Sequence, residues 1–230
     1  MGRRDELAAG LAGVRGRIAA ACALAQRPAD SVTLVVVTKT FPAADVRLLA
    51  SLGVHDVGEN RDQEAAPKAA ECDDLDLVWH FVGQLQTNKA GSVARYAHVV
   101  HSLDRVRVVD AVSRAADAAA RVVTGLVQVN LDERAGRGGA RPEDVPAVAD
   151  RIAAAPGLRL GGVMAVAPLD APPAPAFARL LEVAARLRAD HPGATWVSAG
   201  MSADLEAAIE HGATHVRVGS AILGERPPGG

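Results

Sequence analysis

Short apolar runs recur along the chain and alternate with amphipathic segments rich in alanine. The apolar runs have the length and composition of buried strands and lie at 33–38, 54–58, 77–83, 97–102, 122–130, 160–166, 194–200 and 214–220. Helix-forming segments, often with Asp, Ser, Asn or Pro near their starts, lie at 43–52, 60–71, 103–120, 142–155, 173–190 and 202–211. Strand followed by helix, repeated in this way, predicts an α/β fold: a single (β/α)8 TIM barrel preceded by an extra N-terminal helix at about 3–25.

The length of the chain leaves no room for a second domain. Its 230 residues lie at the low end of the roughly 200 to 250 residues usual for such a barrel, so residues 1–230 are expected to form one domain. Segments 132–144 and 168–176 are expected to be loops after the fifth and sixth strands. An open doubly wound sheet is the alternative fold, but the first strand is not followed by the GxGxxG pattern typical of it.

Charge and composition narrow the classes of partner. A formal net charge of −2 and the absence of a basic run argue against nucleic acid and against a polybasic membrane patch. Charged residues interrupt segment 1–22, so neither a signal peptide nor a membrane span fits, and we expect a cytoplasmic protein. Cys22 and Cys72 form no CxxC, and the histidines show no HxH or HExxH spacing, so we expect no metal and regard the histidines as structural.

Chemistry in such a barrel is found at the carboxyl ends of the strands, where Lys39 follows the β-branched run Val35–Val37. The chain has only three lysines, the others being Lys68 and Lys89, among 25 basic residues. Lys39 is either a solvated lysine at a strand end or a Schiff-base amine. Partial desolvation at the apolar mouth of a barrel would favour the neutral, nucleophilic amine that a Schiff base needs.

The segments that follow the last two predicted strands, 198–202 and 217–220, are rich in hydrogen-bond donors. Such barrels commonly bind phosphate at this place, so Ser202 is either a helix cap or an anion ligand. Arg217 alternates with His215 and Gly219 on one face of the eighth strand. If this face is the barrel interior, Arg217 forms either an internal ion pair, with Glu59 as the candidate, or a contact to a ligand.

These motifs together strongly resemble one family. "VVTKTFP", "VGENRDQEAAPK", "WHFVGQLQTNK", "HSLD", "QVN", "VMAVAP" and "SAGMSADLEAAIEHGATHVRVGSAILGER" resemble the pyridoxal-phosphate homeostasis proteins, single-domain relatives of the alanine racemase barrel, over residues 34 to 226. The resemblance implies a barrel that holds pyridoxal 5′-phosphate as a Schiff base. It implies roles in cofactor binding for Lys39 (the Schiff base), Arg217 (facing the pyridine nitrogen), Ser202, Gly219 and Ser220 (phosphate), Ser198 close to the phosphate, and Asn60 and Met201 beside the cofactor. Gln84, Arg61 and Ala199 depart from the family pattern and leave details of the pocket rim open.

The resemblance implies a pyridoxal phosphate-binding protein that buffers the cofactor or delivers it to apo-forms of dependent enzymes, as a monomer or weak homodimer and without efficient catalysis. Racemases of this fold use a tyrosine from a second domain, and this chain has only Tyr96. Arginine facing a ring nitrogen cannot accept its proton, which leaves the ring a poorer electron sink. The alternatives are a pyridoxal phosphate-dependent racemase or decarboxylase acting through Lys39, and a Schiff-base aldolase that uses no cofactor.

Overall fold

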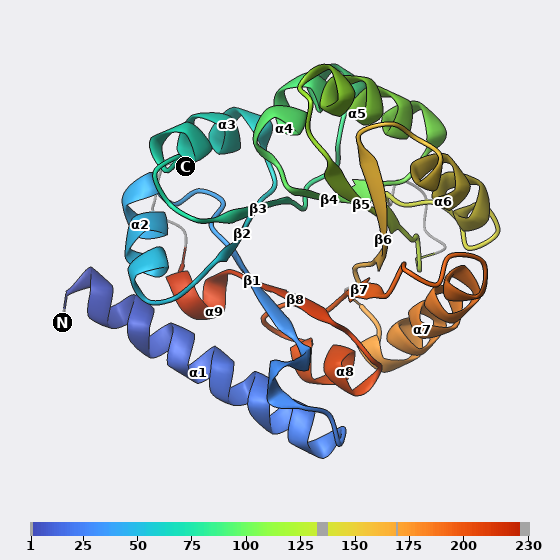
Figure 1. The fold of residues 1–230 in the computed structure, drawn as a ribbon. Coiled ribbons are helices and arrows are strands. Elements are labelled where there is room, and N and C mark those ends of the chain that lie inside the picture. Colours follow the sequence, from blue (N-terminus) through green and yellow to red (C-terminus); the bar gives the residue numbers. More distant parts are fainter. Residues whose placement is uncertain (1, 133–137, 169, 226–230) are drawn as a thin grey trace.

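The strands close into a barrel. The computed structural model describes residues 2–132, 138–168 and 170–225, in which eight parallel strands follow one another around the barrel and β8 pairs with β1 (Figure 1). The strands are β1 (Thr33–Val37), β2 (Asp56–Glu59), β3 (Val78–Phe81), β4 (Val99–Leu103), β5 (Val123–Gln128), β6 (Leu158–Met164), β7 (Trp196–Ser198) and β8 (His215–Val218). Each strand lies within or beside its predicted apolar run, so the predicted (β/α)8 barrel is confirmed.

Helices surround the barrel in the order that the sequence predicts (Figure 1). They are α1 (Arg3–Leu24), α2 (Ala43–Ser51), α3 (Asp62–Glu71), α4 (Ala90–Tyr96), α5 (Val106–Ala118), α6 (Val145–Ala153), α7 (Pro173–Asp190), α8 (Leu205–Glu210) and α9 (Ser220–Leu223), with short 3₁₀ turns at Ala29–Ser31 and Thr87–Lys89. The predicted loops 132–144 and 168–176 lie partly outside the described residues. That residues 1–230 form a single domain stays a prediction.

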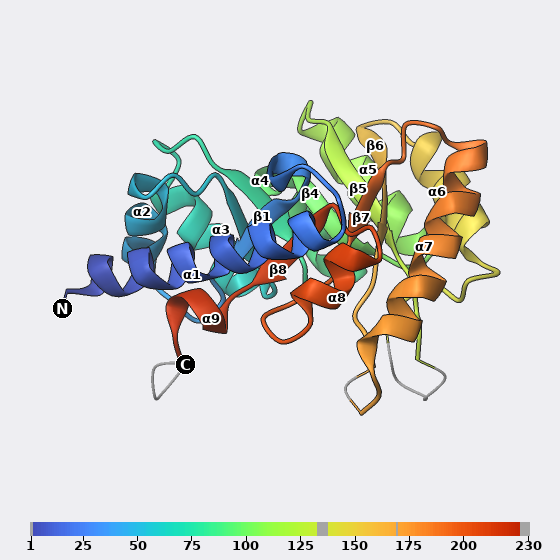
Figure 2. The same ribbon diagram turned by 90° about the horizontal axis from the view of Figure 1, so that it is seen from below.

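The extra helix α1 lies across the outside of the barrel, beside α2, α8 and α9 (Figures 1 and 2). Its buried side chains recur every three or four residues, at Leu7, Leu11, Val14 and Ile18. Gly10 allows the close approach to α9, because a Cβ at this position would lie 2.7 Å from the Ile222 carbonyl oxygen. The apolar stripe of α1 therefore closes the layer around the first and last strands.

Among the described helices, α1 alone has the length and apolar composition that crossing a membrane would require. Charged residues Arg4, Arg15 and Arg17 lie along it, and Arg17 forms an ion pair with Glu206 of α8 at 2.6 Å. The buried stripe and this ion pair explain its composition as that of a helix packed on the barrel.

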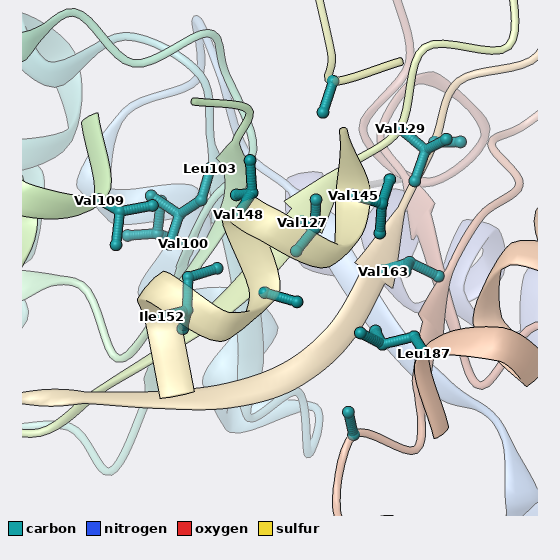
Figure 3. Packing of buried hydrophobic residues seen from close by; sticks show 14 of the residues in the cluster. Val100, Leu103, Val109, Val127, Val129, Val145, Val148, Ile152, Val163 and Leu187 are labelled. Carbon is teal, nitrogen blue, oxygen red and sulfur yellow. The ribbon is translucent and has the colours of Figure 1, made fainter. Parts of the chain in front are cut away.

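The main core lies between the barrel and its helices. Figure 3 shows Val127 and Val163 on the strands facing Ile152 of α6 and Leu187 of α7, all of them buried. Because side chains alternate along a strand, the other set of positions points into the barrel. Several of these interior side chains are polar and buried, among them His80, His101, Ser198, His215 and Arg217. These polar side chains extend through the interior toward the carboxyl ends of the strands.

Candidate functional site

A cavity of about 780 Å³ lies at the carboxyl ends of β1, β2, β3, β6, β7 and β8. Seven of the eight side chains or backbone positions predicted from the sequence line it: Lys39, Asn60, Met201, Ser202, Arg217, Gly219 and Ser220. The eighth, Ser198, does not line the cavity; it is fully buried below it and accepts a hydrogen bond from Arg217. The structure thus brings together residues that are separated by up to 181 positions in the chain, from 39 to 220.

The three lysines differ in their partners. Lys68 Nζ contacts Glu59 Oε1 at 2.5 Å, and Lys89 Nζ lies 3.8 Å from Asp62 Oδ2. Lys39 forms no hydrogen bond or ion pair with another described residue, and it is partly buried at the cavity wall. Lys39 is therefore the one lysine of the chain with a free amine at this cavity.

The Lys68–Glu59 pair is buried beside the Lys39 segment. Glu59 Oε1 accepts hydrogen bonds from Lys68 Nζ and from Thr38 Oγ1, the latter at 2.6 Å, and Lys68 Nζ also donates to the Thr38 carbonyl at 2.9 Å. Burial raises the pKa of the Glu59 carboxyl, against the lowering effect of the Lys68 ammonium. The pair ties α3 to the end of β1 and keeps the second lysine away from the cavity.

The two loops predicted to bind phosphate face each other. Ser220 Oγ donates to Ser202 Oγ at 3.2 Å, and both residues line the cavity. Gly219, between the last strand and Ser220, packs closely on the end of β1, because a Cβ there would lie 2.9 Å from the Val37 carbonyl oxygen. The backbone and hydroxyl donors of these loops form a cradle suited to an anionic group.

Of the two alternatives for Ser202, a helix cap or an anion ligand, the structure excludes the cap. Helix α8 begins at Leu205 with Asp204 as its N-cap residue, and the Asp204 carboxylate accepts a hydrogen bond of 2.6 Å from the Met201 amide. The helix starts three residues later than expected because Asp204 closes the turn before it. Ser202 therefore does not cap the helix, and its hydroxyl is hydrogen-bonded to Ser220 of the facing loop.

Of the two alternatives for Arg217, the ion pair with Glu59 is not formed. Arg217 Nη1 donates to Ser198 Oγ at 2.6 Å and Nη2 donates to the Ala165 carbonyl oxygen at 2.9 Å. Burial lowers the pKa of the Arg217 guanidinium from 12.5 to about 10, while Asp204 opposes this change. The group is still a cation at neutral pH, and it presents its remaining N–H donors without a carboxylate in ion-pair contact among the described residues.

Three residues, Arg61, Gln84 and Ala199, depart from the family pattern. Arg61 and Gln84 are exposed, and Arg61 forms a surface ion pair with Glu64 at 3.4 Å. Ala199 is buried in the core between strands and helices. None of the three is among the residues that line the cavity, although Arg61 and Gln84 directly follow Asn60 and Gly83, which do.

Sequence reasoning missed Thr40, which also lines the cavity. Its φ angle is +68°, a conformation that β-branched residues rarely adopt, and its amide donates to Glu64 Oε2 at 3.0 Å. Its hydroxyl oxygen is buried without a hydrogen-bond partner. The turn thus fixes the backbone next to Lys39, and no sequence pattern signals a left-handed threonine.

The sequence analysis regarded the histidines as structural but did not identify their hydrogen-bond partners. His80 and His101 are fully buried in the barrel interior and are hydrogen-bonded to each other. No cluster of three or more His, Cys, Asp or Glu side chains in the described part of the chain could hold a metal ion. The prediction that the protein binds no metal stays a prediction.

Comparisons with known proteins place the chain in a family. The family model described as alanine racemase, N-terminal domain, matches residues 15–227. A pyridoxal phosphate homeostasis protein of Mycobacterium tuberculosis is 45% identical over 244 residues, which cover 97% of this chain and 94% of that protein. The structure of PipY from Synechococcus elongatus with PLP bound is 34% identical and covers 95% of this chain and all of PipY, with a TM-score of 0.83.

A more distant structure shares the fold alone. Alanine racemase from Corynebacterium glutamicum is 15% identical, with a TM-score of 0.67. The match covers 99% of this chain and 62% of the racemase, so a large part of the racemase lies outside the match.

Proposed function

Because the chain belongs to the pyridoxal phosphate homeostasis protein family, with the alanine racemase N-terminal barrel, we propose that it binds pyridoxal 5′-phosphate in the cavity and holds it through Lys39. The observation that carries the proposal is the free amine of Lys39, on the same cavity wall as an anion cradle and a buried cation. When bound, pyridoxal phosphate supplies an aldehyde that condenses with a primary amine to form a Schiff base and water.

The residues of the cavity fit the charges of such a ligand. Ser202, Gly219 and Ser220 provide donors for its phosphate group, and the amines of Lys68 and Lys89 are already occupied by carboxylates. Arg217 can donate to a ring nitrogen but cannot accept a proton from it. Asn60 and Met201 complete the wall, and Ser198 orients the arginine from below.

We propose further that the protein stores the cofactor or hands it to apo-enzymes without efficient turnover of amino acids. The only tyrosine, Tyr96, lines a different cavity of about 570 Å³ beside α3 and α4, and burial raises its pKa. Among the described residues that line the Lys39 cavity, Glu225 is the only carboxylate, and it is exposed. The described residues that line the cavity therefore include no buried acid opposite Lys39, which two-base racemisation needs.

Trapping the adduct tests the role of Lys39. The purified protein is titrated with pyridoxal phosphate, reduced with borohydride, digested and analysed by mass spectrometry. We expect the modification on Lys39 alone and its loss in Lys39→Ala. Lys89→Ala is the matched control, because Lys89 is partly exposed and lies outside the cavity, and it should bind like the wild type. A modified peptide containing Lys68 or Lys89 in the wild type contradicts the assignment.

Two further assays separate a carrier from the alternatives. The loaded protein is mixed with an apo-enzyme that needs the cofactor, and regained activity measures transfer. Chiral chromatography after long incubation with amino acids measures racemisation. Transfer without racemisation supports the carrier, whereas racemisation that Lys39→Ala abolishes would make the protein an enzyme. A chain that binds no cofactor but cleaves aldol substrates would support the aldolase.

A further inference from the structure

Five polar side chains form an unbroken line through the barrel interior. Asp56 Oδ1 lies 2.9 Å from His80 Nε2, His80 Nδ1 lies 2.9 Å from His101 Nε2, and His101 Nδ1 lies 2.9 Å from Ser198 Oγ. Ser198 Oγ accepts the 2.6 Å hydrogen bond from Arg217 Nη1. The line begins at the first residue of β2, passes through β3 and β4 to β7, and ends at the cavity.

Only the Asp56 end of this line meets solvent outside the cavity. The Asp56 side chain is 27% exposed, whereas the relative exposure is 1% for His80 and 0% for His101 and Ser198. Water cannot satisfy the polar atoms in the middle, so each must be satisfied by its neighbours in the line. Burial also lowers the pKa of His101 well below its usual value, which keeps that ring neutral.

The two ends of the line fix the direction of every hydrogen bond in it. Arg217 has only donors, and an ionised carboxylate at Asp56 has only acceptors. Ser198 Oγ accepts a hydrogen bond from Arg217 and can donate its own O–H to His101 Nδ1. His101 then carries its proton on Nε2 and donates to His80 Nδ1. His80 likewise carries its proton on Nε2 and donates to Asp56.

We propose that Asp56, His80, His101 and Ser198 form a directional hydrogen-bond chain in which both histidines are Nε2–H tautomers, and that Asp56 is a positioning residue for Arg217 from the opposite end of the barrel. The chain places the Ser198 oxygen lone pair toward the guanidinium. Arg217 is thereby held by two acceptors, Ser198 Oγ and the Ala165 carbonyl, and its other donors are free for the cavity.

The same chain offers the buried cation a distant counter-charge. No carboxylate in the described part of the chain lies in ion-pair contact with Arg217, although it is only 5% exposed. Hydrogen bonds that all point one way polarise one another, so the negative charge of Asp56 acts on Arg217 through three intervening groups. The reverse direction would need an extra proton at the Asp56–His80 end, because two acceptors would otherwise meet there.

The first test needs neither a variant nor a ligand. In apo protein labelled with ¹⁵N on histidine, two-bond ¹H–¹⁵N spectra report which ring nitrogen carries a proton, and a ¹⁵N–¹⁵N coupling across the hydrogen bond links the two rings. We expect a coupling between His101 Nε2 and His80 Nδ1, with the proton on His101 Nε2. A proton on His80 Nδ1, or no coupling between the rings, overturns the proposed direction.

The second test asks whether Asp56 acts through Ser198, and only this test rests on the proposed function. Asp56→Asn keeps the shape and removes the charge, and Ser198→Ala cuts the chain next to Arg217. We expect each to weaken pyridoxal phosphate binding about three- to tenfold, and the double variant to be no weaker than Ser198→Ala alone. Asp30→Asn is the matched control, because Asp30 is exposed and precedes β1 at the same end of the barrel.

The measurements distinguish failure of the hydrogen-bond chain from failure of the positioning role and of the proposed function. Asp56→Asn should shift the ring ¹⁵N signals of His101, which Asp56 does not touch, whereas Asp30→Asn should not. Losses of affinity that add in the double variant would show that Asp56 acts independently of Ser198 and would overturn the positioning role. If the wild type binds no pyridoxal phosphate, the proposed function fails, and the tautomers and the His101 shift still decide the hydrogen-bond chain.

Discussion

Removing the Lys68 ammonium should show how much the buried Lys68–Glu59 ion pair contributes to the stability of the fold. In Lys68→Met the apolar stem of the side chain is kept and the ammonium is lost, so the change isolates the charge. Glu59 then loses one of the two hydrogen bonds on Oε1 and keeps that from Thr38, while its Oε2 has no partner even in the wild type. A fully buried carboxylate would be left without a counter-ion.

The burial of both partners sets the size of the effect. Relative side-chain exposure is 7% for Lys68 and 0% for Glu59, so water cannot replace the lost contact. Breaking such a pair typically destabilises a protein by about 3 to 5 kcal/mol. Lys89→Met provides the control: Asp62 is 8% exposed, but Lys89 is 34% exposed and the ion pair is 3.8 Å long, beyond hydrogen-bond distance, so the loss should be clearly smaller than in Lys68→Met.

The loss should also depend on pH in a defined direction. Burial already raises the pKa of Glu59, and without Lys68 the pKa rises further. Between the unfolded and folded pKa values the folded state binds more protons, so the free energy of unfolding falls as pH increases. We expect the deficit of Lys68→Met to be about 1 to 3 kcal/mol larger at pH 8 than at pH 5.5, because a protonated Glu59 needs no counter-ion.

Urea unfolding followed by circular dichroism at both pH values measures these differences. Adding Glu59→Gln to Lys68→Met should recover part of the stability by removing the buried charge. A deficit in Lys68→Met as small as that in Lys89→Met, or one that does not change with pH, would refute the reasoning. The Lys39 adduct should still form in folded Lys68→Met, because Lys68 does not line the cavity.

Two other perturbations test the interior and the anion cradle. Burial lowers the pKa of His215 to about 4, so the unfolded state binds more protons below pH 6.5, and the free energy of unfolding should fall by about 2 kcal/mol from this histidine between pH 6.5 and 5. His215→Gln should flatten that pH dependence in urea unfolding, whereas a change at exposed His55 should not. Gly219→Ala should weaken pyridoxal phosphate binding in spectral titration and destabilise the fold by about 1 to 3 kcal/mol, because its Cβ would lie 2.9 Å from the Val37 carbonyl. Gly193→Ala, with nothing within 4 Å of its Cβ, should leave both quantities unchanged.

The fold was predictable because its signal is periodic. Each apolar run is short enough for one strand, and helix α7 at Pro173–Asp190 coincides with the predicted segment 173–190. The short helices α4 and α9 were not predicted, since seven and four residues show too little periodicity. The polar residues at the strand ends could be grouped for the same reason, because a closed parallel barrel brings all its carboxyl ends to one side.

The partners of the polar side chains were less predictable than the fold, although the sequence could have decided between the two alternatives for Arg217. Along β2 the side chains alternate, so Asp56 shares the interior face and Glu59 lies on the outer face, toward Lys68 of α3. Arg217 points into the barrel. Alternation along β2 and β8 therefore already separates Glu59 from Arg217 and argues against the ion pair that was one of the two alternatives for Arg217.

The hydrogen-bond chain could not be predicted from the alternation of side chains alone. Alternation places Asp56, His80, His101, Ser198 and Arg217 inside the barrel, but it does not say at which depth each lies. Depth depends on the stagger between neighbouring strands, which the structure gives as Gly58 opposite His80 and His80 opposite Val99. A shift of two residues in either register would keep every side chain inside and break the contacts. The buried polar groups therefore add a requirement that the apolar pattern does not: each must meet its partner, so they favour this register over others that bury the same surface.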